Sequence, residues 1–189
     1  MIFDALRLIQ AAVQNYMSSL ELNEAVMLDN IAMAGDLGGP KNQLNGHLVM
    51  SLVNLQEEST LKNGQYSRPV GERVAYQPPP VPVNLFLLFS ALHEDYGTAL
   101  KVLSRVVECF QASREISSMT VPRPLEVSPD VKVFLDLYSL TFEQLNHLWG
   151  ALGGKQVPFL LYRARLVTID AERLQAEGNA IYIPEVQIK

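Results

Sequence analysis

The sequence has 189 residues, of which 48% are hydrophobic and 19% are charged, and its formal net charge is −5. This length suits one domain with a substantial core and is short for two. An acidic chain without a cluster of Lys and Arg argues against a large nucleic-acid interface. The single cysteine, Cys109, excludes an internal disulfide, and with three scattered histidines it argues against most zinc sites.

The negative charge is concentrated near the start of the chain. Residues 1–60 hold seven acidic and two basic side chains, whereas the remaining 129 residues hold 13 of each. This asymmetry has two interpretations: a surface that meets different partners on different faces, or a solvated acidic surface, which is commoner. No run of about 18 apolar residues occurs, so we expect no membrane insertion, and the N-terminal residues lack the pattern of a secretion signal.

The first predicted element is an amphipathic helix that ends before Asn23. Residues 25–32 and 46–56 then read as strands, and the turn formers of 35–43 separate them. We expect these two strands to pair antiparallel across a long loop. The apolar positions of the helix are Ile2, Leu6, Ile9, Val13, Tyr16, Met17 and Leu20.

The middle of the chain combines prolines with an apolar strand. Residues 57–82 show little periodicity and predict a long loop or extended arm. Proline has no backbone N–H, so the strand that follows is expected to start only near Val83. In Val83 to Ala91 both alternating sets of side chains are apolar, which is typical of a strand covered on both faces. We therefore place this strand at the centre of the sheet.

A second amphipathic helix is predicted for residues 96–111, with Asp95 as its polar start. An irregular connection follows at 112–130, and residues 131–138 alternate as a strand with one core face. The expected apolar stripe of the helix comprises Tyr96, Leu100, Leu103, Val107 and Phe110.

A short third helix begins at Thr141, which forms a capping box with Gln144, and it stops at the glycine pair 153–154. Residues 159–169 alternate as a strand, and 181–188 can form an edge strand or a tail. These elements predict one α+β domain over residues 1–189. Its mixed, mainly antiparallel sheet is flanked by the N-terminal helix and two further helices.

Motifs that suggest chemistry do not hold up in context. The turn at 149–156 resembles a phosphate-binding loop, but the pattern lacks its first glycine, and Gln156 stands where Ser or Thr is required. Adjacent residues on a helix point apart, so His93, Glu94 and Asp95 cannot converge on a metal. Cys109 lacks basic neighbours that would lower its pKa, and we expect a buried thiol. The sequence thus predicts no catalytic residue, metal or cofactor.

Arg163 and Arg165 lie on the same face of their predicted strand. Two guanidinium groups in this arrangement can bind a carboxylate of a neighbouring subunit. The alternative is a solvated face with pairing inside the chain.

The order of these signals resembles a known family. The residues that carry the resemblance are the N-terminal helix, P-x-P-V-N-L-x-L-L-x-S-A at 80–91, the helix at 96–111, and W-G-A-L-G-G-K at 149–155 before P-F-L-L-Y-R-A-R at 158–165. Together they are similar to the cap, or tail-terminator, proteins of phage-tail-like extracellular contractile injection systems.

The resemblance implies a structural protein without enzymatic activity. It implies a hexameric ring of identical subunits that binds the inner tube and sheath proteins, ends their polymerisation and fixes particle length, with no nucleic acid and no cofactor. It also implies assembly in the cytoplasm and a particle that can be released from the cell. The alternatives are another baseplate or tail component and, less favoured, a small-molecule-binding domain or an enzyme.

The candidate interface residues come from exposed-looking turns, the paired arginines and the chain end. Strand addition by residues 181–189 to a neighbouring sheet is one specific hypothesis. The candidates are Pro80, Pro82, Trp149, Lys155, Arg163, Arg165, Ile181, Ile183 and Val186.

Overall fold

The computed structural model of the protein describes residues 2–22, 24–33, 43–58, 67–70, 73–76, 81–118, 120–121, 131–169 and 176–179. The chain divides into two compact units, each of which is described by itself. The larger unit comprises Met1–Gln56 with Val83–Val167, and the smaller comprises Glu57–Pro82 with Thr168–Lys189. The single domain predicted for residues 1–189 stays a prediction.

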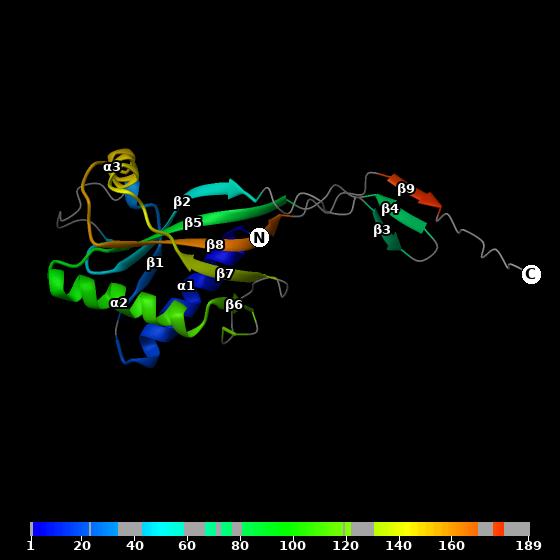
Figure 1. Ribbon diagram of the computed structural model, residues 1–189. Coiled ribbons are helices and arrows are strands. Elements are labelled where there is room, and N and C mark those ends of the chain that lie inside the picture. Colours follow the sequence, from blue (N-terminus) through cyan, green and yellow to red (C-terminus); the bar gives the residue numbers. More distant parts are fainter. Residues whose placement is uncertain are drawn as a thin grey trace, which may run out of the picture. The chain divides into compact units, whose positions relative to one another are not determined.

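A mixed six-stranded sheet forms the centre of the larger unit, with strand order β1-β2-β5-β8-β7-β6. Helices α1 and α2 lie on one side of this sheet and α3 lies on the other (Figure 1). The predicted α+β class with three helices is confirmed. In chain order the elements are α1 (Ile2–Ser19), β1 (Val26–Leu28), the 3-10 turn η1 (Ile31–Met33), β2 (Leu48–Glu57), β5 (Val81–Ala91), α2 (Tyr96–Ala112), β6 (Glu115–Ser117), β7 (Lys132–Leu137), α3 (Phe142–Ala151) and β8 (Phe159–Ile169).

Strand β5 occupies the interior of the sheet, as its doubly apolar pattern predicts. On one face, Phe89 meets Phe110 of α2 edge to face, with 5.5 Å between the ring centroids. On the other face, Leu88 packs with Leu161 of β8 and with Trp149 of α3. Because successive side chains of a strand point to opposite faces, this one strand joins the cores under both layers of helices.

The start of β5 differs from the prediction by two residues. The strand begins at Val81 and includes Pro82, whereas the sequence analysis placed its start near Val83. The carbonyl of Pro82 accepts a hydrogen bond from the N–H of Glu58 at 2.9 Å. Proline lacks a donor but keeps its acceptor, so it fits a strand end where only the carbonyl is used.

Strands β1 and β2 pair in parallel, and the predicted antiparallel pairing is wrong. Val26 lies opposite Leu48, and Leu28 lies opposite Met50. The glycine-rich residues between the strands suggested a hairpin. However, the connection from 29 to 47 is long enough to return the chain to the same end of the sheet, as a parallel pair requires.

Two segments predicted as loops contain strands. Residues 57–82 include β3 (Ser67–Val70) and β4 (Arg73–Tyr76), which form a three-stranded sheet with β9 (Ala176–Asn179) in the smaller unit. Within 112–130, β6 pairs antiparallel with β7. Strands of three or four residues are too short to show periodicity, and β4 also pairs with β9, which lies about 100 residues away. The predicted C-terminal strand at 181–188 lies outside the described residues.

Both predicted signals at the ends of α3 are confirmed. The Thr141 side chain accepts from the N–H of Gln144, and the Gln144 side chain accepts from the N–H of Thr141. At the other end, Gly153 and Gly154 adopt positive φ angles of 108° and 83°. The N–H of Gly154 donates to the carbonyl of Trp149 at 2.7 Å, which closes the last turn of the helix.

The buried face of α2 differs from the predicted stripe. Tyr96 is 65% exposed and Leu100 is 44% exposed, although both were expected in the core. The helix packs against α1 as well as the sheet, so the contact face is turned toward α1. The residues that α2 buries are Ala99, Val102, Leu103, Val106, Cys109 and Phe110.

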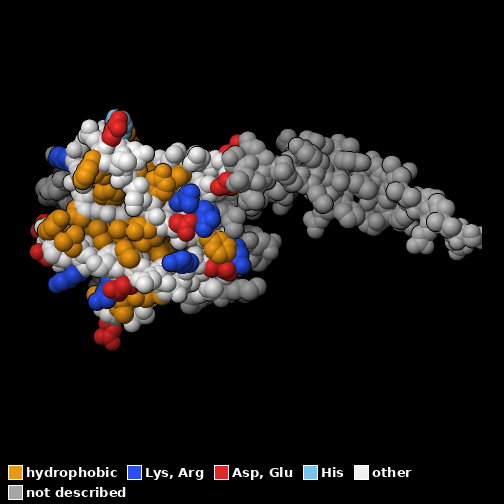
Figure 2. Space-filling model, in the orientation of Figure 1, with side chains coloured by type: hydrophobic (Ala, Val, Ile, Leu, Met, Phe, Trp, Pro, Cys, Tyr) orange, Lys and Arg blue, Asp and Glu red, His pale blue; other side chains and the backbone are white. Residues whose placement is uncertain are grey.

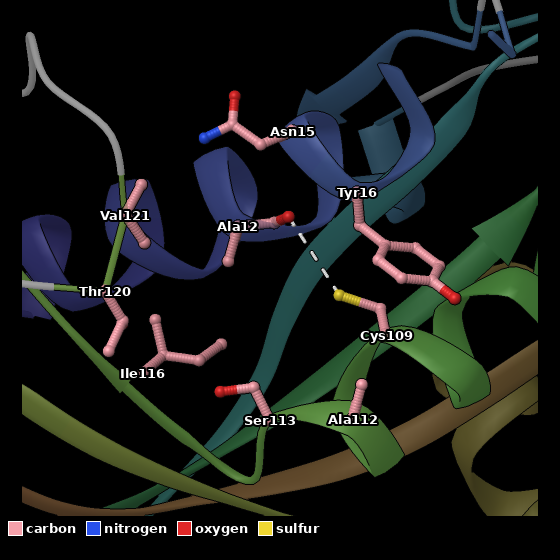
Figure 3. A pocket seen from close by; sticks show the side chains of 9 residues that line it. All are labelled: Ala12, Asn15, Tyr16, Cys109, Ala112, Ser113, Ile116, Thr120 and Val121. Carbon is pink, nitrogen blue, oxygen red and sulfur yellow. Dashed lines mark hydrogen bonds between the residues drawn. The ribbon is translucent and has the colours of Figure 1, made fainter. Parts of the chain in front are cut away.

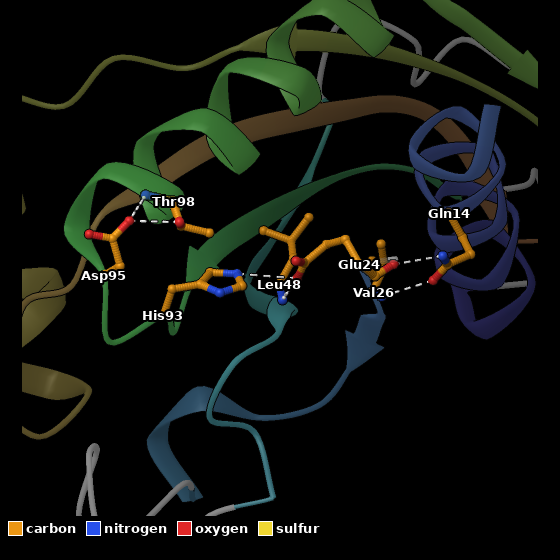
Figure 4. Close-up of polar contacts among 7 residues, drawn as sticks. All are labelled: Gln14, Glu24, Val26, Leu48, His93, Asp95 and Thr98. Atoms are coloured by element: carbon orange, nitrogen blue, oxygen red, sulfur yellow. Dashed lines mark hydrogen bonds and ion pairs between the residues drawn. The ribbon is translucent and has the colours of Figure 1, made fainter. Parts of the chain in front are cut away.

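Polar contacts tie the chain between α1 and β1 to the rest of the larger unit (Figure 4). The Glu24 carboxylate accepts from the N–H of Leu48 at 2.8 Å, and the same oxygen lies 3.3 Å from Nε2 of His93. The Gln14 side chain of α1 donates to the carbonyl of Glu24 and accepts from the N–H of Val26. Glu24 and His93 therefore serve the fold.

Asp95 caps α2, as predicted, and its role gives a test. Its carboxylate accepts from the N–H and the hydroxyl of Thr98, and these hydrogen bonds lower its pKa. The stabilisation is thus present above the unfolded pKa of about 3.9 and is lost as the pH falls through the lower folded value.

We expect Asp95→Ala to lower the urea midpoint at pH 7 and to have less effect near pH 3. Asp95→Asn, which keeps a capping oxygen, is the control, and an equal loss in both variants would contradict the assignment.

Candidate partner-binding surfaces

Arg163 and Arg165 of β8 converge on Asp136 of the neighbouring strand β7. Nη2 of Arg163 lies 3.5 Å from Oδ2 of Asp136, and Nε of Arg165 lies 2.5 Å from the same oxygen. Antiparallel pairing places Asp136 directly opposite Arg163, so the contact follows from the register of the two strands. The structure therefore has the alternative arrangement, in which both arginines pair with a carboxylate of the same chain.

The cluster of Asp136 and the two arginines carries one net positive charge on a half-exposed face of the sheet. The three side chains are between 36% and 43% exposed. Next to them on β7, the ammonium group of Lys132 lies 5.7 Å from the ring centre of Phe134 and 2.8 Å from Glu115 of β6. Binding of a carboxylate from a neighbouring subunit by these two arginines stays a prediction.

The other predicted interface residues lie in different surroundings. Trp149 is 4% exposed and packs edge to face with Phe159, so its indole belongs to the core under α3. Pro82 is buried within β5, and Lys155 is exposed in the turn after α3. Contact of these residues with neighbouring subunits stays a prediction. Four predicted residues lie outside the described part of the chain: Pro80, Ile181, Ile183 and Val186.

A mostly apolar pocket of about 270 Å³ lies between α1, α2 and β6, and the sequence analysis missed it. Figure 3 shows Tyr16 and Cys109 on one side of it and Ile116 and Val121 on the other. The pocket joins elements that are about 100 residues apart in the sequence, and one of them is the short strand β6. No local pattern could have indicated it.

Cys109 lies at the edge of this pocket and is buried, as predicted. Burial raises the pKa of its thiol to about 11. The S–H donates weakly to the carbonyl of Ala12, at a sulfur–oxygen distance of 3.9 Å. A neutral thiol is a poor nucleophile and a poor metal ligand, so this pocket does not have the features of a reactive cysteine site.

Among the described residues, no group of three or more His, Cys, Asp or Glu side chains is placed to hold a metal ion. None of the helices in the described part of the chain combines the length and the apolar character that crossing a membrane requires.

A protein family matches nearly the whole chain. The sequence model of the family described as "Pvc16 N-terminal domain" matches residues 5–182, which is almost the whole chain. No curated protein sequence matches the chain.

Two solved structures have a similar fold. One is the sheath/tube terminator, in the extended state, of the extracellular contractile injection system PVC, with a TM-score of 0.68 and 13% identity over 100% of this chain and 63% of that chain. The other is the tube-terminating cap of the anti-feeding prophage, with a TM-score of 0.58 and 13% identity over 88% of this chain and 54% of that chain. The chain thus spans less than two thirds of either protein.

We expect Asp136→Ala to lower the free energy of unfolding by roughly 1 kcal/mol, because the two arginines then face each other without their shared anion. Glu115→Ala removes a single exposed ion pair, with Lys132, and is expected to cost only a few tenths of a kcal/mol. Added salt should shrink the effect of Asp136→Ala. Urea unfolding at low and high salt measures the loss of stability in each variant and its dependence on salt. Equal losses in the two variants would refute the shared role of Asp136.

Cys109 should react slowly with an aromatic disulfide reagent while the protein is folded. At pH 8 a thiol with a pKa of about 11 is roughly a hundredfold less ionised than one at its ordinary value of 9.0. Absorbance of the released thiolate, followed with and without denaturant, measures the two rates. Similar rates in the folded and unfolded states would show that the thiol is accessible and ionised.

Proposed function

The chain belongs to the Pvc16 N-terminal domain family, and on this basis we propose that it is a cap of a contractile injection particle. In this role it terminates the inner tube and the sheath and fixes the length of the particle. The observation that carries the proposal is the similarity of fold, over 100% of this chain, to a sheath/tube terminator.

The proposed assembly is a ring of identical subunits, with six copies as the expected number. A head-to-tail contact closes into a ring when each interface turns the next subunit by the required angle. A closed ring presents a different surface from an open helical tube. It can therefore accept the last ring of the tube on one face and present no site for a further ring on the other.

The contacts proposed for this assembly include the outer side of the Arg163 and Arg165 pair. Asp136 contacts both guanidinium groups, and the two arginine side chains are 36% and 43% exposed, so part of each stays accessible in a defined geometry. A fixed pair of this kind loses less side-chain entropy on binding than two mobile arginines would. The exposed Lys155, the residues near Pro82 and the chain end beyond residue 180 remain further candidates.

The proposed function needs no catalysis. Both solved relatives are described as terminating or capping structures. In the described residues the side chains that most often perform chemistry have structural roles: Glu24 with His93 fixes the start of β1, Asp95 caps α2, and Cys109 is a buried neutral thiol. These roles support a structural protein. The proposed location is the cytoplasm during assembly, as part of a particle that can be released from the cell.

Particles made without this chain test the proposal. Loss of a cap should give tubes and sheaths of variable length, because nothing then ends their growth. Loss of a baseplate component, the alternative function, should give no assembled sheaths. Electron microscopy of particles from producing cells with the gene deleted, and with it restored on a plasmid, separates these outcomes. Particles of normal, uniform length in the deletion strain would overturn the capping role.

A further inference from the structure

The outer edge of strand β2 is open over more than half of its length. The strand has ten residues, Leu48–Glu57, and its neighbours in the sheet are β1 and β5. Strand β1 lies beside only the first three, from Leu48 to Met50. On the side away from β5, residues 52–57 therefore have no strand beside them in the described part of the chain. Six residues of a strand extend about 20 Å, which is the length of a typical strand.

The chain that follows β1 leaves this edge at a defined point. The N–H of Asp29 donates to the carbonyl of Met50 at 3.2 Å. The Ser51 hydroxyl then donates to the carbonyl of Asp29 and accepts from the N–H of Ile31 at 3.0 Å. Ile31 packs into the core cluster under α3. A side chain of β2 thus holds the departing segment, and the described chain leaves the edge before Leu52.

The two end strands of the same sheet have outward-facing backbone groups that are occupied. In β1, the N–H of Val26 donates to the Gln14 side chain, and its carbonyl accepts from the Gln10 side chain. In β6, the N–H of Ser117 donates to the Thr120 hydroxyl, and its carbonyl accepts from the N–H of Thr120. Natural sheets protect their edges in such ways, because an unprotected edge pairs with another chain. Within the described part of this sheet, the edge of β2 lacks this protection.

An open edge specifies its ligand more closely than an apolar surface does. Figure 2 shows a band of hydrophobic side chains across one face of the larger unit, which many kinds of apolar surface could cover. A row of backbone N–H and C=O groups along a strand forms its regular hydrogen bonds with one kind of ligand, another extended chain. The edge of β2 therefore indicates a strand supplied by a further polypeptide segment.

We propose that the open edge of β2 accepts residues 181–189 of a neighbouring copy of this chain as an added strand. The proposal rests on the proposed function, because a ring of identical subunits joined head to tail needs one surface that accepts and a different surface that donates. Main-chain hydrogen bonds supply the affinity in this mode of recognition, and alternate side chains supply the specificity.

The described strands of a neighbouring copy are poorer donors. The outward groups of β1 and β6 are occupied, β3 contains Pro69, and β9 has the sequence Ala-Glu-Gly-Asn, which offers little to pack. Two β2 edges could pair with each other. That contact is two-fold and uses both edges, so it joins two copies and leaves no edge for a third.

Residues 181–189 have the best strand pattern among the segments outside the described ranges. The other such segments of more than five residues contain glycine or proline, as in 34–42, 59–66 and 122–130, or three charged side chains, as in 170–175. After Pro184, Val186 and Ile188 alternate with polar residues. On an added strand these two would point to one face, where they can cover Leu52 or Leu55, which are 38% and 44% exposed on β2.

Photo-cross-linking in assembled particles tests the proposal directly. Two versions of the chain are produced together: one carries a benzophenone amino acid in place of Gln56, and the other carries Val186→Ile, which marks its C-terminal segment by mass. Purified particles are irradiated, and the cross-linked peptides are identified by mass spectrometry. The expected product joins residue 56 to residues 181–189, and both the native and the marked segment are found in it. The matched control carries the benzophenone group at Lys101, which is exposed on α2.

Three outcomes would overturn the proposal. A product that contains only the native segment would show that the segment pairs within its own copy. A product with the tube or sheath protein would show a different donor, and the absence of a product at residue 56 would show that the edge has none.

A proline substitution tests the backbone pairing itself. Leu48 directs its N–H to the outer side of β2, where it donates to Ala25, and the alternation along the strand directs the N–H of Leu52 to the same side. Leu52→Pro removes this donor at an edge, where proline is tolerated. It should lower the yield of the cross-link by about tenfold, whereas Leu52→Ala, which keeps the N–H, should retain most of it. Circular dichroism checks that both variants are folded, and equal yields from the two would contradict pairing through the backbone.

The gene deletion separates failure of this proposal from failure of the proposed function. If deletion alters particle length but residue 56 gives no product with residues 181–189, the strand addition is wrong and the capping role stands. If deletion leaves particle length unchanged, the capping role itself fails.

Discussion

The burial of β5 on both of its faces is the constraint that organises the larger unit. A strand whose side chains are apolar in both directions must be covered above and below, since either face left in water would lose the hydrophobic stabilisation of several large side chains. Phe89 on one face and Leu88 on the other are both fully buried, so each face needs a cover. Helices α1 and α2 cover the first face, and α3 covers part of the second.

The surfaces available to partners follow from how incompletely the helices cover the sheet. Helix α3 has only ten residues and packs on the sheet through its own residue Trp149. The part of β7 and β8 that carries Asp136 and Arg163 therefore has no covering helix. On the opposite layer, α2 is turned toward α1, which leaves one apolar stripe at the border of the core. Both the arginine pair and this stripe are thus consequences of core packing, and neither is a separate element added to the fold.

The proposed capping role requires stable surfaces, and polar groups in the described part of this protein fix the chain. Glu24 holds the segment between α1 and β1 against His93 and β2, and Asp95 fixes the start of α2. Each of these residues stabilises a boundary between elements. A scaffold whose segments are fixed in this way can present the arginine pair in one geometry to every neighbour, as the proposed ring would demand.

The sequence by itself determined the elements whose signals are local. The doubly apolar pattern of 83–91 specified the central strand, Thr141 with Gln144 specified the start of α3, and the glycines at 153–154 specified its end, because each depends on residues within one or two turns. Only the tertiary structure decided the rest. The rest comprises the parallel pairing of β1 with β2, the pairing of β4 with β9, the turning of α2 toward α1 and the meeting of Arg163 with Asp136. All of these depend on contacts between distant segments. A local pattern carries no information on which distant segment is the partner, and the free energy of the whole packed unit makes that choice.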